Sequence, residues 1–370
     1  MDIPSSGSFS TSVSELTDKA KRAMMSLFST IMRFNFPFRK SIQLFGTYVE
    51  PILFYNSENQ SALTDKQIDK CKRSKTHIYD IATKSPITTT QPKFMKFVMG
   101  VGKHCPNMVV FGESASLPLQ VKAYIHMLNF WNRVKEMEDQ TLVKMAYKEN
   151  LAMNTNWCKT IQVLNSSFNL HSKHINPKIF PNVMRKKITS DFINYWKNRI
   201  SNPKIEKKLS LYSDIKQKFD IEPYMNLPFR DRQIISKIVG SSHTLQIETG
   251  RHRDIPREDR LCKICDLKQV EDEEHFITEC PAYKKIRLDF FGKEKLIAKK
   301  MLLEIDPEIM AAFLRSIYSP RQKLVEEKPQ EYHLIRHDIM KFTFIKGPKK
   351  IHQVQNISKD GLKMRITLKK

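Results

Sequence analysis

The sequence Arg-Leu-Cys-Lys-Ile-Cys at residues 260–265, followed at residues 275–283 by His-Phe-Ile-Thr-Glu-Cys-Pro-Ala-Tyr, decides how this chain is interpreted. Its cysteines and histidine follow the order Cys-x2-Cys-x9-His-x4-Cys, with ligand candidates Cys262, Cys265, His275 and Cys280. Three thiolates and one imidazole are the ligand set of a tetrahedral structural zinc site. We therefore expect the four side chains to bind Zn²⁺ as a structural ion. No coordination position stays open for water or substrate, because the protein supplies all four ligands.

An alternative interpretation is that the three cysteines are buried apolar side chains and that His275 satisfies an ordinary hydrogen bond. The other cysteines of the chain, Cys71, Cys105 and Cys158, are widely scattered. Three Cys and one His within nineteen residues therefore favour a metal site over chance.

The residues between and after the ligands predict local structure. The acids at 271–274 favour the start of a helix, since carboxylates interact well with the positive end of the helix dipole. We expect these acids to be a solvated face and not to act as ligands or bases. Pro281 disfavours helical geometry at Cys280, which should be extended. A helix should then begin at Pro281, with an apolar stripe of Tyr283, Ile286 and Phe290.

The overall charge indicates a polyanionic partner. Lys and Arg number 63 against 39 Asp and Glu, a net charge of +24. This exceeds what solubility needs, so RNA and DNA are the expected partners, the alternative being that the lysines are simply solvated. The 370 residues include only ten glycines and no Gly-rich phosphate loop, which argues against a nucleotide-cradling fold.

The N-terminus lacks the apolar segment of a secretory signal, and no stretch is long enough to span a bilayer. We expect an intracellular protein in a reducing compartment, nuclear or cytoplasmic, with no membrane partner.

Hydrophobic periodicity predicts a mostly α fold. Helices are expected at about 14–34, 42–53 with an interruption at Pro51, 64–82, 91–101, 118–137, 139–150, 156–165, 181–199 and 203–218. The best strand candidate is residues 243–248, where apolar and polar side chains alternate up to Gly250.

Basic residues around the cysteine cluster are candidates for phosphate binding, because guanidinium groups pair well with phosphate oxygens. The candidates for nucleic-acid contacts are Arg251, Arg253, Arg257, Arg260, Lys263, Lys284 and Lys285. Acids are interleaved among the arginines, so local salt bridges are an equal alternative. From 341 to 370, nine Lys or Arg face one Asp, which predicts a flexible basic tail.

Several segments resemble reverse transcriptases of non-LTR retrotransposons, the endonuclease-reverse transcriptase family. Residues 242–251, the Arg-x2-Arg-x-Cys-x2-Cys run at 257–265, residues 270–276 and Cys-Pro-Ala-Tyr at 280–283 are similar to the zinc-binding C-terminal region of these enzymes. Residues 44–55 resemble the segment just after the polymerase palm. Residues 94–101, 111–113 and 118–119 resemble the connector that follows. The resemblance covers about residues 6–325, although Asn56 and Gln60 stand where the family usually has Gly and Trp.

This resemblance implies three regions that grip the RNA template and the nascent DNA: thumb-like helices at 1–85, a helical connector at 86–225 and a zinc-knuckle domain at 226–325. The predicted basic tail at 326–370 lies outside the resemblance. The family's polymerases hold two metal ions with a Tyr- or Phe-x-Asp-Asp turn, which is absent from the 370 residues. We therefore expect no catalytic residues in this chain. We expect the chain to start after the palm and to lack the upstream endonuclease, and hence to have no polymerase activity by itself.

Two alternatives remain open. The sequence can belong to an active RNA-directed DNA polymerase whose gene model was truncated. It can also be a zinc-stabilised protein-interaction module.

Overall fold

The computed structural model describes residues 9–73, 76–170, 176–202, 208–292 and 297–326, with only the backbone described for 322–326. Within these ranges the chain is mostly helical and has no strand, which confirms the predicted fold class in its coarse form. An isolated antiparallel bridge joins Leu261 to Val270. None of the described helices is both long and apolar enough to cross a membrane.

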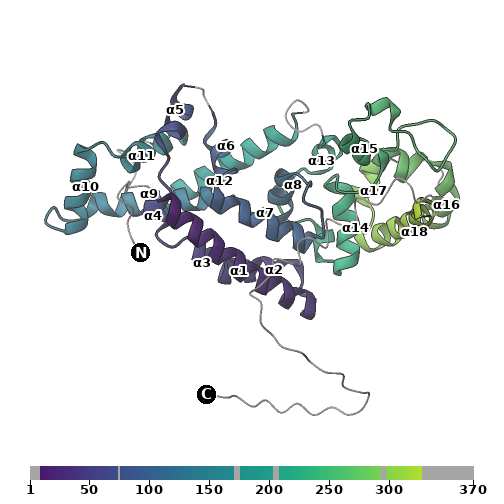
Figure 1. Ribbon diagram of the computed structural model, residues 1–370, viewed down its shortest axis with the longest axis horizontal. Coiled ribbons are helices and arrows are strands. Elements are labelled where there is room, and N and C mark those ends of the chain that lie inside the picture. Colours follow the sequence, from purple (N-terminus) through teal and green to yellow (C-terminus); the bar gives the residue numbers. More distant parts are fainter. Residues whose placement is uncertain (1–8, 74–75, 171–175, 203–207, 293–296, 327–370) are drawn as a thin grey trace, which may run out of the picture. The chain divides into compact units, whose positions relative to one another are not determined.

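The first part of the chain forms nine helices in the described ranges up to residue 136 (Figure 1). They are α1 (Ser10–Phe34), α2 (Phe38–Tyr48), α3 (Glu50–Leu53), α4 (Ser57–Gln60), α5 (Asp65–Arg73), α6 (Ile78–Ala82), α7 (Pro86–Met99), α8 (Asn107–Ser114) and α9 (Leu119–Glu136). The helix expected at 42–53 is divided between α2 and α3, because Pro51 occupies the first turn of α3. The helix expected at 64–82 is divided into α5 and α6.

The remaining elements are shorter on average. They are α10 (Leu142–Ala152), α11 (Asn156–Ser167), α12 (Phe180–Ile200), α13 (Ser210–Ile215), η2 (Pro223–Asn226), α14 (Phe229–Val239), α15 (Gln246–Thr249), η3 (Arg251–Arg253), η4 (Arg257–Asp259), η5 (His275–Glu279), η6 (Pro281–Tyr283), α16 (Lys284–Phe291), α17 (Ala298–Glu304) and α18 (Pro307–Glu326). Of the helix expected at 203–218, residues 203–207 lie outside the described ranges, 210–215 form α13, and 216–218 are not helical.

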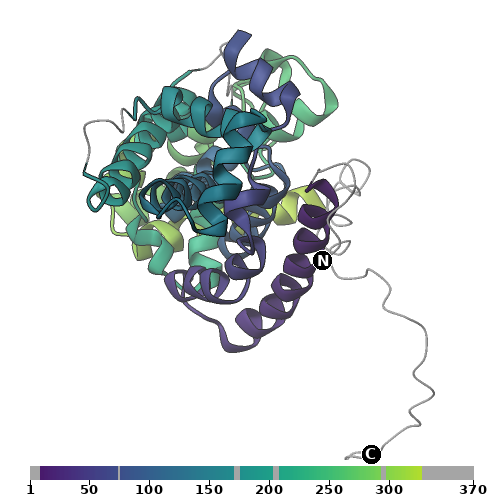
Figure 2. The ribbon, with the colours of Figure 1, turned by 90° about the vertical axis from the view of Figure 1, so that its left-hand side faces the viewer.

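Two helices organise the core. Helix α7 contacts α1, α2, α8, α9 and α14, and α9 contacts α4, α6, α7, α10, α11 and α12. The side chain of Ser85 accepts a hydrogen bond from Thr88 N and caps α7, which ends at Gly100 with φ 73°. Their apolar side chains belong to one continuous buried cluster that extends to α18. Figure 2 shows α1, in dark purple, at the edge of the helices in that view.

The strand predicted at 243–248 is wrong. Residues 246–249 form the short helix α15, in which Thr249 N donates to Leu245 O at 3.0 Å. The alternation of apolar and polar side chains is too short to specify a strand when no neighbouring strand is present in the described ranges to pair with it.

Residues up to Leu324 belong to one compact unit, and Val325 begins the second. Most of the predicted basic tail, residues 327–370, lies outside the described residues. The predicted region limits at 85 and 225 stay predictions.

Candidate metal centre

The first two ligand candidates lie on a narrow loop. Cys262 N donates to Gln269 O at 2.8 Å, and Glu271 N donates to Arg260 O at 2.9 Å. These two bonds flank the bridge between Leu261 and Val270 and close the loop at its base. Lys268 takes a left-handed conformation, with φ 51°, near the point where the chain reverses. The loop therefore presents Cys262 and Cys265 together.

The other two candidates lie at opposite ends of one wide helical turn, η5. Asp272 Oδ1 accepts a hydrogen bond from His275 N at 3.0 Å and so caps the start of the turn. Cys280 N donates to His275 O at 2.8 Å, which links the two ligand residues directly. Cys280 has φ −56° and ψ 121°, the extended geometry predicted before Pro281. The expected helix then follows as η6 and α16.

The structure brings all four candidates together. Each residue offers one ligand atom, and the four atoms lie within 4.8 Å of one another. Cys265 Sγ is 3.4 Å from His275 Nε2. Zinc bonds of about 2.0–2.3 Å imply ligand separations of about 3.5–3.8 Å in a tetrahedron. His275, Cys262 and Cys280 are buried and Cys265 is half-buried. The cluster can therefore hold a metal ion.

A hydrogen bond orients the imidazole. His275 Nδ1 lies 3.0 Å from Gln269 Oε1, an acceptor, so Nδ1 carries the proton. In the neutral imidazole Nε2 is then the unprotonated nitrogen, and it lies on the side of Cys265. A metal-binding histidine typically makes such a bond with its second ring nitrogen. Gln269 was not identified from the sequence, and no pattern in the sequence marks it.

Within the cluster, Cys262 favours the deprotonated form. A hydrogen bond from the Cys280 thiol lowers the pKa of Cys262 to about 3. The same hydrogen bond raises the pKa of Cys280 above its ordinary value. The buried Arg287 donates from Nη2 to Cys280 O at 2.8 Å, so a cation lies next to this residue. Since metals bind the thiolate form of cysteine, the low pKa of Cys262 suits its role as a metal ligand.

The acids at 271–274 are not the solvated face that was expected. Glu271 is 1% exposed and forms an ion pair with Arg321 of α18. Glu273 Oε1 lies 2.8 Å from His243 Nε2. Arg321 and His243 are 50 and 30 residues away in sequence, so inspection of the acidic run alone could not find these partners. None of the four acids belongs to the metal cluster.

Three of the arginines expected at phosphate groups have partners within the protein. Arg251 Nη1 lies 2.5 Å from Glu248 Oε1, and Arg257 Nη2 lies 3.3 Å from Asp272 Oδ2. Arg260 donates to Ile255 O and Ile247 O. Arg251 and Arg257 therefore form the local salt bridges of the alternative interpretation, and Arg260 bonds to the backbone beside the metal loop. Nucleic-acid contacts by these three arginines stay a prediction.

The other candidates for nucleic-acid contacts, Arg253, Lys263, Lys284 and Lys285, are exposed. Their role in nucleic-acid binding stays a prediction. A comparison of the chain with protein-family models, with curated proteins and with solved structures finds no match.

Proposed function

We propose that Cys262, Cys265, His275 and Cys280 bind one Zn²⁺ that stabilises the surrounding fold. The observation that carries this proposal is the convergence of four ligand atoms within 4.8 Å. Three thiolates suit Zn²⁺ better than Mg²⁺ or Ca²⁺, which prefer oxygen ligands. With four protein ligands the ion supplies no catalytic water, so its contribution is to folding.

We propose further that the chain binds RNA and DNA. Its net charge of +24 supports this, because each Lys or Arg that meets a phosphate releases condensed counterions and favours binding. The resemblance of residues 6–325 to the C-terminal part of non-LTR retrotransposon reverse transcriptases supports the same partner. Such a protein would act inside the cell, in the nucleus or the cytoplasm.

We propose that the chain alone does not polymerise DNA, since its sequence has no Tyr- or Phe-x-Asp-Asp turn. Incubation of the purified chain with primed RNA, Mg²⁺ and deoxynucleotides should give no primer extension. Extension would contradict the proposal and favour the active polymerase among the alternatives. A reading frame immediately upstream that encodes the paired aspartates would support a truncated gene model.

Salt dependence tests nucleic-acid binding. For single strands, the logarithm of the binding constant falls with the logarithm of the salt concentration by about 0.7 per phosphate contact. We expect a steep slope with a labelled oligonucleotide. A slope no steeper than that of an unrelated basic protein would favour the protein-interaction module instead.

A further inference from the structure

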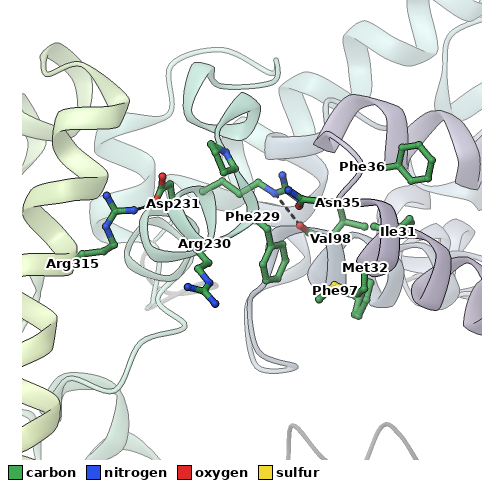
Figure 3. A pocket seen from close by; sticks show the side chains of 12 residues that line it. Ile31, Met32, Asn35, Phe36, Phe97, Val98, Phe229, Arg230, Asp231 and Arg315 are labelled. Atoms are coloured by element: carbon green, nitrogen blue, oxygen red, sulfur yellow. Dashed lines mark hydrogen bonds and ion pairs between the residues drawn. The ribbon is translucent and has the colours of Figure 1, made fainter. Parts of the chain in front are cut away.

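A pocket of about 390 Å³ opens between α1, α7, α14 and α18 (Figure 3). This volume is in the lower part of the range of about 300–1,000 Å³ that is usual for small-molecule sites. It is lined by Ile31, Met32, Asn35, Phe36, Phe97, Val98, Pro228, Phe229, Arg230, Asp231, Arg232 and Arg315. The pocket therefore has apolar side chains of α1 and α7 on one side and the arginines of α14 on the other.

The distinctive group of the pocket is Arg232, a buried cation. It is 2% exposed, and it donates from Nε to Val98 O at 3.1 Å and from Nη1 to Leu227 O at 3.2 Å. Both acceptors are neutral carbonyls, and no carboxylate in the described part of the chain pairs with Arg232. A buried charge is normally paired, because its removal from water is costly. Burial lowers the pKa of Arg232 to about 10, which leaves it charged at neutral pH.

The charged side chains around Arg232 leave an excess of positive charge on the α14 side of the pocket. Asp231, the acidic residue that lines the pocket, forms an ion pair with Arg315 of α18 (Figure 3). Arg230 is exposed, and among the described residues it has no hydrogen bond or ion pair. Arg230 also lies in the first turn of α14, whose N-cap residue, Pro228, has no side chain able to cap the helix. The free amide groups and the dipole of a helix N-terminus favour an anion.

The wall beside these cations is aromatic. Phe36, Phe97 and Phe229 are half-buried, so each ring retains an accessible part. The Arg232 guanidinium carbon lies 5.3 Å from the centre of the Phe229 ring, within the range of about 6 Å for a cation–π contact. Figure 3 shows Arg230 and the Phe229 ring extending from the same side of α14, with Met32 and Phe97 beside the ring.

We propose that this pocket binds one nucleotide of a single-stranded nucleic acid, with its phosphate at Arg230 and Arg232 and its base against Phe229. The proposal rests on the proposed nucleic-acid-binding function and names a site for it. An aromatic ring beside a cationic group is the combination that binds unpaired bases and their backbone without sequence preference. The bases of a duplex are stacked and paired, so a base from a single strand enters this pocket without the free-energy cost of unpairing.

Fluorescence anisotropy with a labelled single-stranded oligonucleotide of about ten nucleotides, within the usual site size of about 4–16, tests the proposal on the full chain. Phe229→Leu keeps an apolar side chain but removes the ring, and it should weaken binding by about fivefold or more. Arg230→Gln should weaken binding and reduce the salt slope by about 0.7. Arg22→Gln makes the same charge change at an exposed position of α1 outside the pocket and should have no comparable effect. Circular dichroism and the urea midpoint verify that each variant folds.

Photo-crosslinking of an oligonucleotide that contains 4-thiouridine locates the contact independently of any substitution. The expected result is a crosslink to the peptide that contains residues 229–232. If the oligonucleotide binds with a steep salt slope but crosslinks elsewhere, and Arg230→Gln behaves like Arg22→Gln, the pocket assignment is wrong and the proposed function stands. If the wild-type chain shows no salt-sensitive binding, both are wrong.

Discussion

Arg321 and Glu271 form a bidentate ion pair, with Nε 2.8 Å from Oε1 and Nη2 2.9 Å from Oε2. Both side chains are almost fully buried. Arg321 also donates to Thr244 O at 2.8 Å, and Glu271 O accepts from Ile247 N at 3.0 Å. This pair therefore ties α18 to the base of the metal loop and to the segment that enters α15.

Replacement of Arg321 by Leu should destabilise the protein strongly, because it leaves the buried Glu271 carboxylate without its cationic partner, with only the hydrogen bond from Gln246 N. Loss of one partner of a buried pair costs about 3–5 kcal/mol, whereas an apolar replacement of both partners is often tolerated. We expect the double variant Glu271→Leu with Arg321→Met to be more stable than Arg321→Leu. Urea unfolding measures the differences. Asp18→Asn, which removes an exposed pair with Lys21, is the control and should leave the midpoint unchanged. An Arg321→Leu midpoint equal to that of the control would contradict this role.

Substitution of one metal ligand should unfold the polypeptide around the metal centre locally. Cys262→Ser and Cys280→Ser each remove a thiolate, so the binding energy that orders this region is lost. Hydrogen exchange should show faster exchange of amides at about 255–290, with protection retained in α7 and α9. Cys71→Ser is the matched control, since Cys71 lies outside the cluster. Equal exchange in wild type and the Cys262→Ser variant would show that no metal orders the region.

Gln269→Ala should weaken metal binding without removing a ligand. The variant loses the acceptor of the His275 Nδ1 proton, and loss of such a supporting bond typically costs about 10–100-fold in affinity. Competition with a chromophoric chelator measures the affinity, and Gln43→Ala, at an exposed position of α2, is the control. An unchanged affinity would mean that Gln269 does not orient the imidazole.

Cys105 should make stability pH-dependent in alkali. Burial raises the pKa of its thiol to about 12 from an ordinary value of 9.0. The folded state holds this proton more tightly than the unfolded state. The protonated thiol therefore contributes fully to the free energy of unfolding below pH 9, and this contribution is lost as pH rises toward 12. The stability of wild type relative to Cys105→Ala should fall across that window, by at most about 1.4 kcal/mol per pH unit. Urea unfolding at several pH values measures it, and a constant difference would contradict the shift.

The metal cluster could be predicted from the sequence because ligand chemistry and spacing are both local. The Cys-x2-Cys pair lies on one loop, and the effect of Pro281 acts on its immediate neighbour, Cys280. Helix interruption at Pro51 could be predicted for the same reason.

Features that depend on distant partners could not be predicted in this way. The acids at 271–274 look solvated until Arg321 and His243 are placed beside them. The alternation at 243–248 resembles a strand, but Ile247 N bonds to Glu271 O in the metal loop. Arg232 is one of several arginines in a basic chain, and its burial against Val98 follows only from the contact of α14 with α7.

The metal content of the full chain tests the central claim most directly. Elemental analysis of protein purified under reducing conditions with zinc present should give one Zn²⁺ per wild-type chain and none in the variant Cys262→Ser with Cys280→Ser. Replacement of zinc by Co²⁺ should give the visible absorption of a tetrahedral, thiolate-bound ion. Wild-type protein without stoichiometric metal, or equal metal in wild type and variant, would contradict the account.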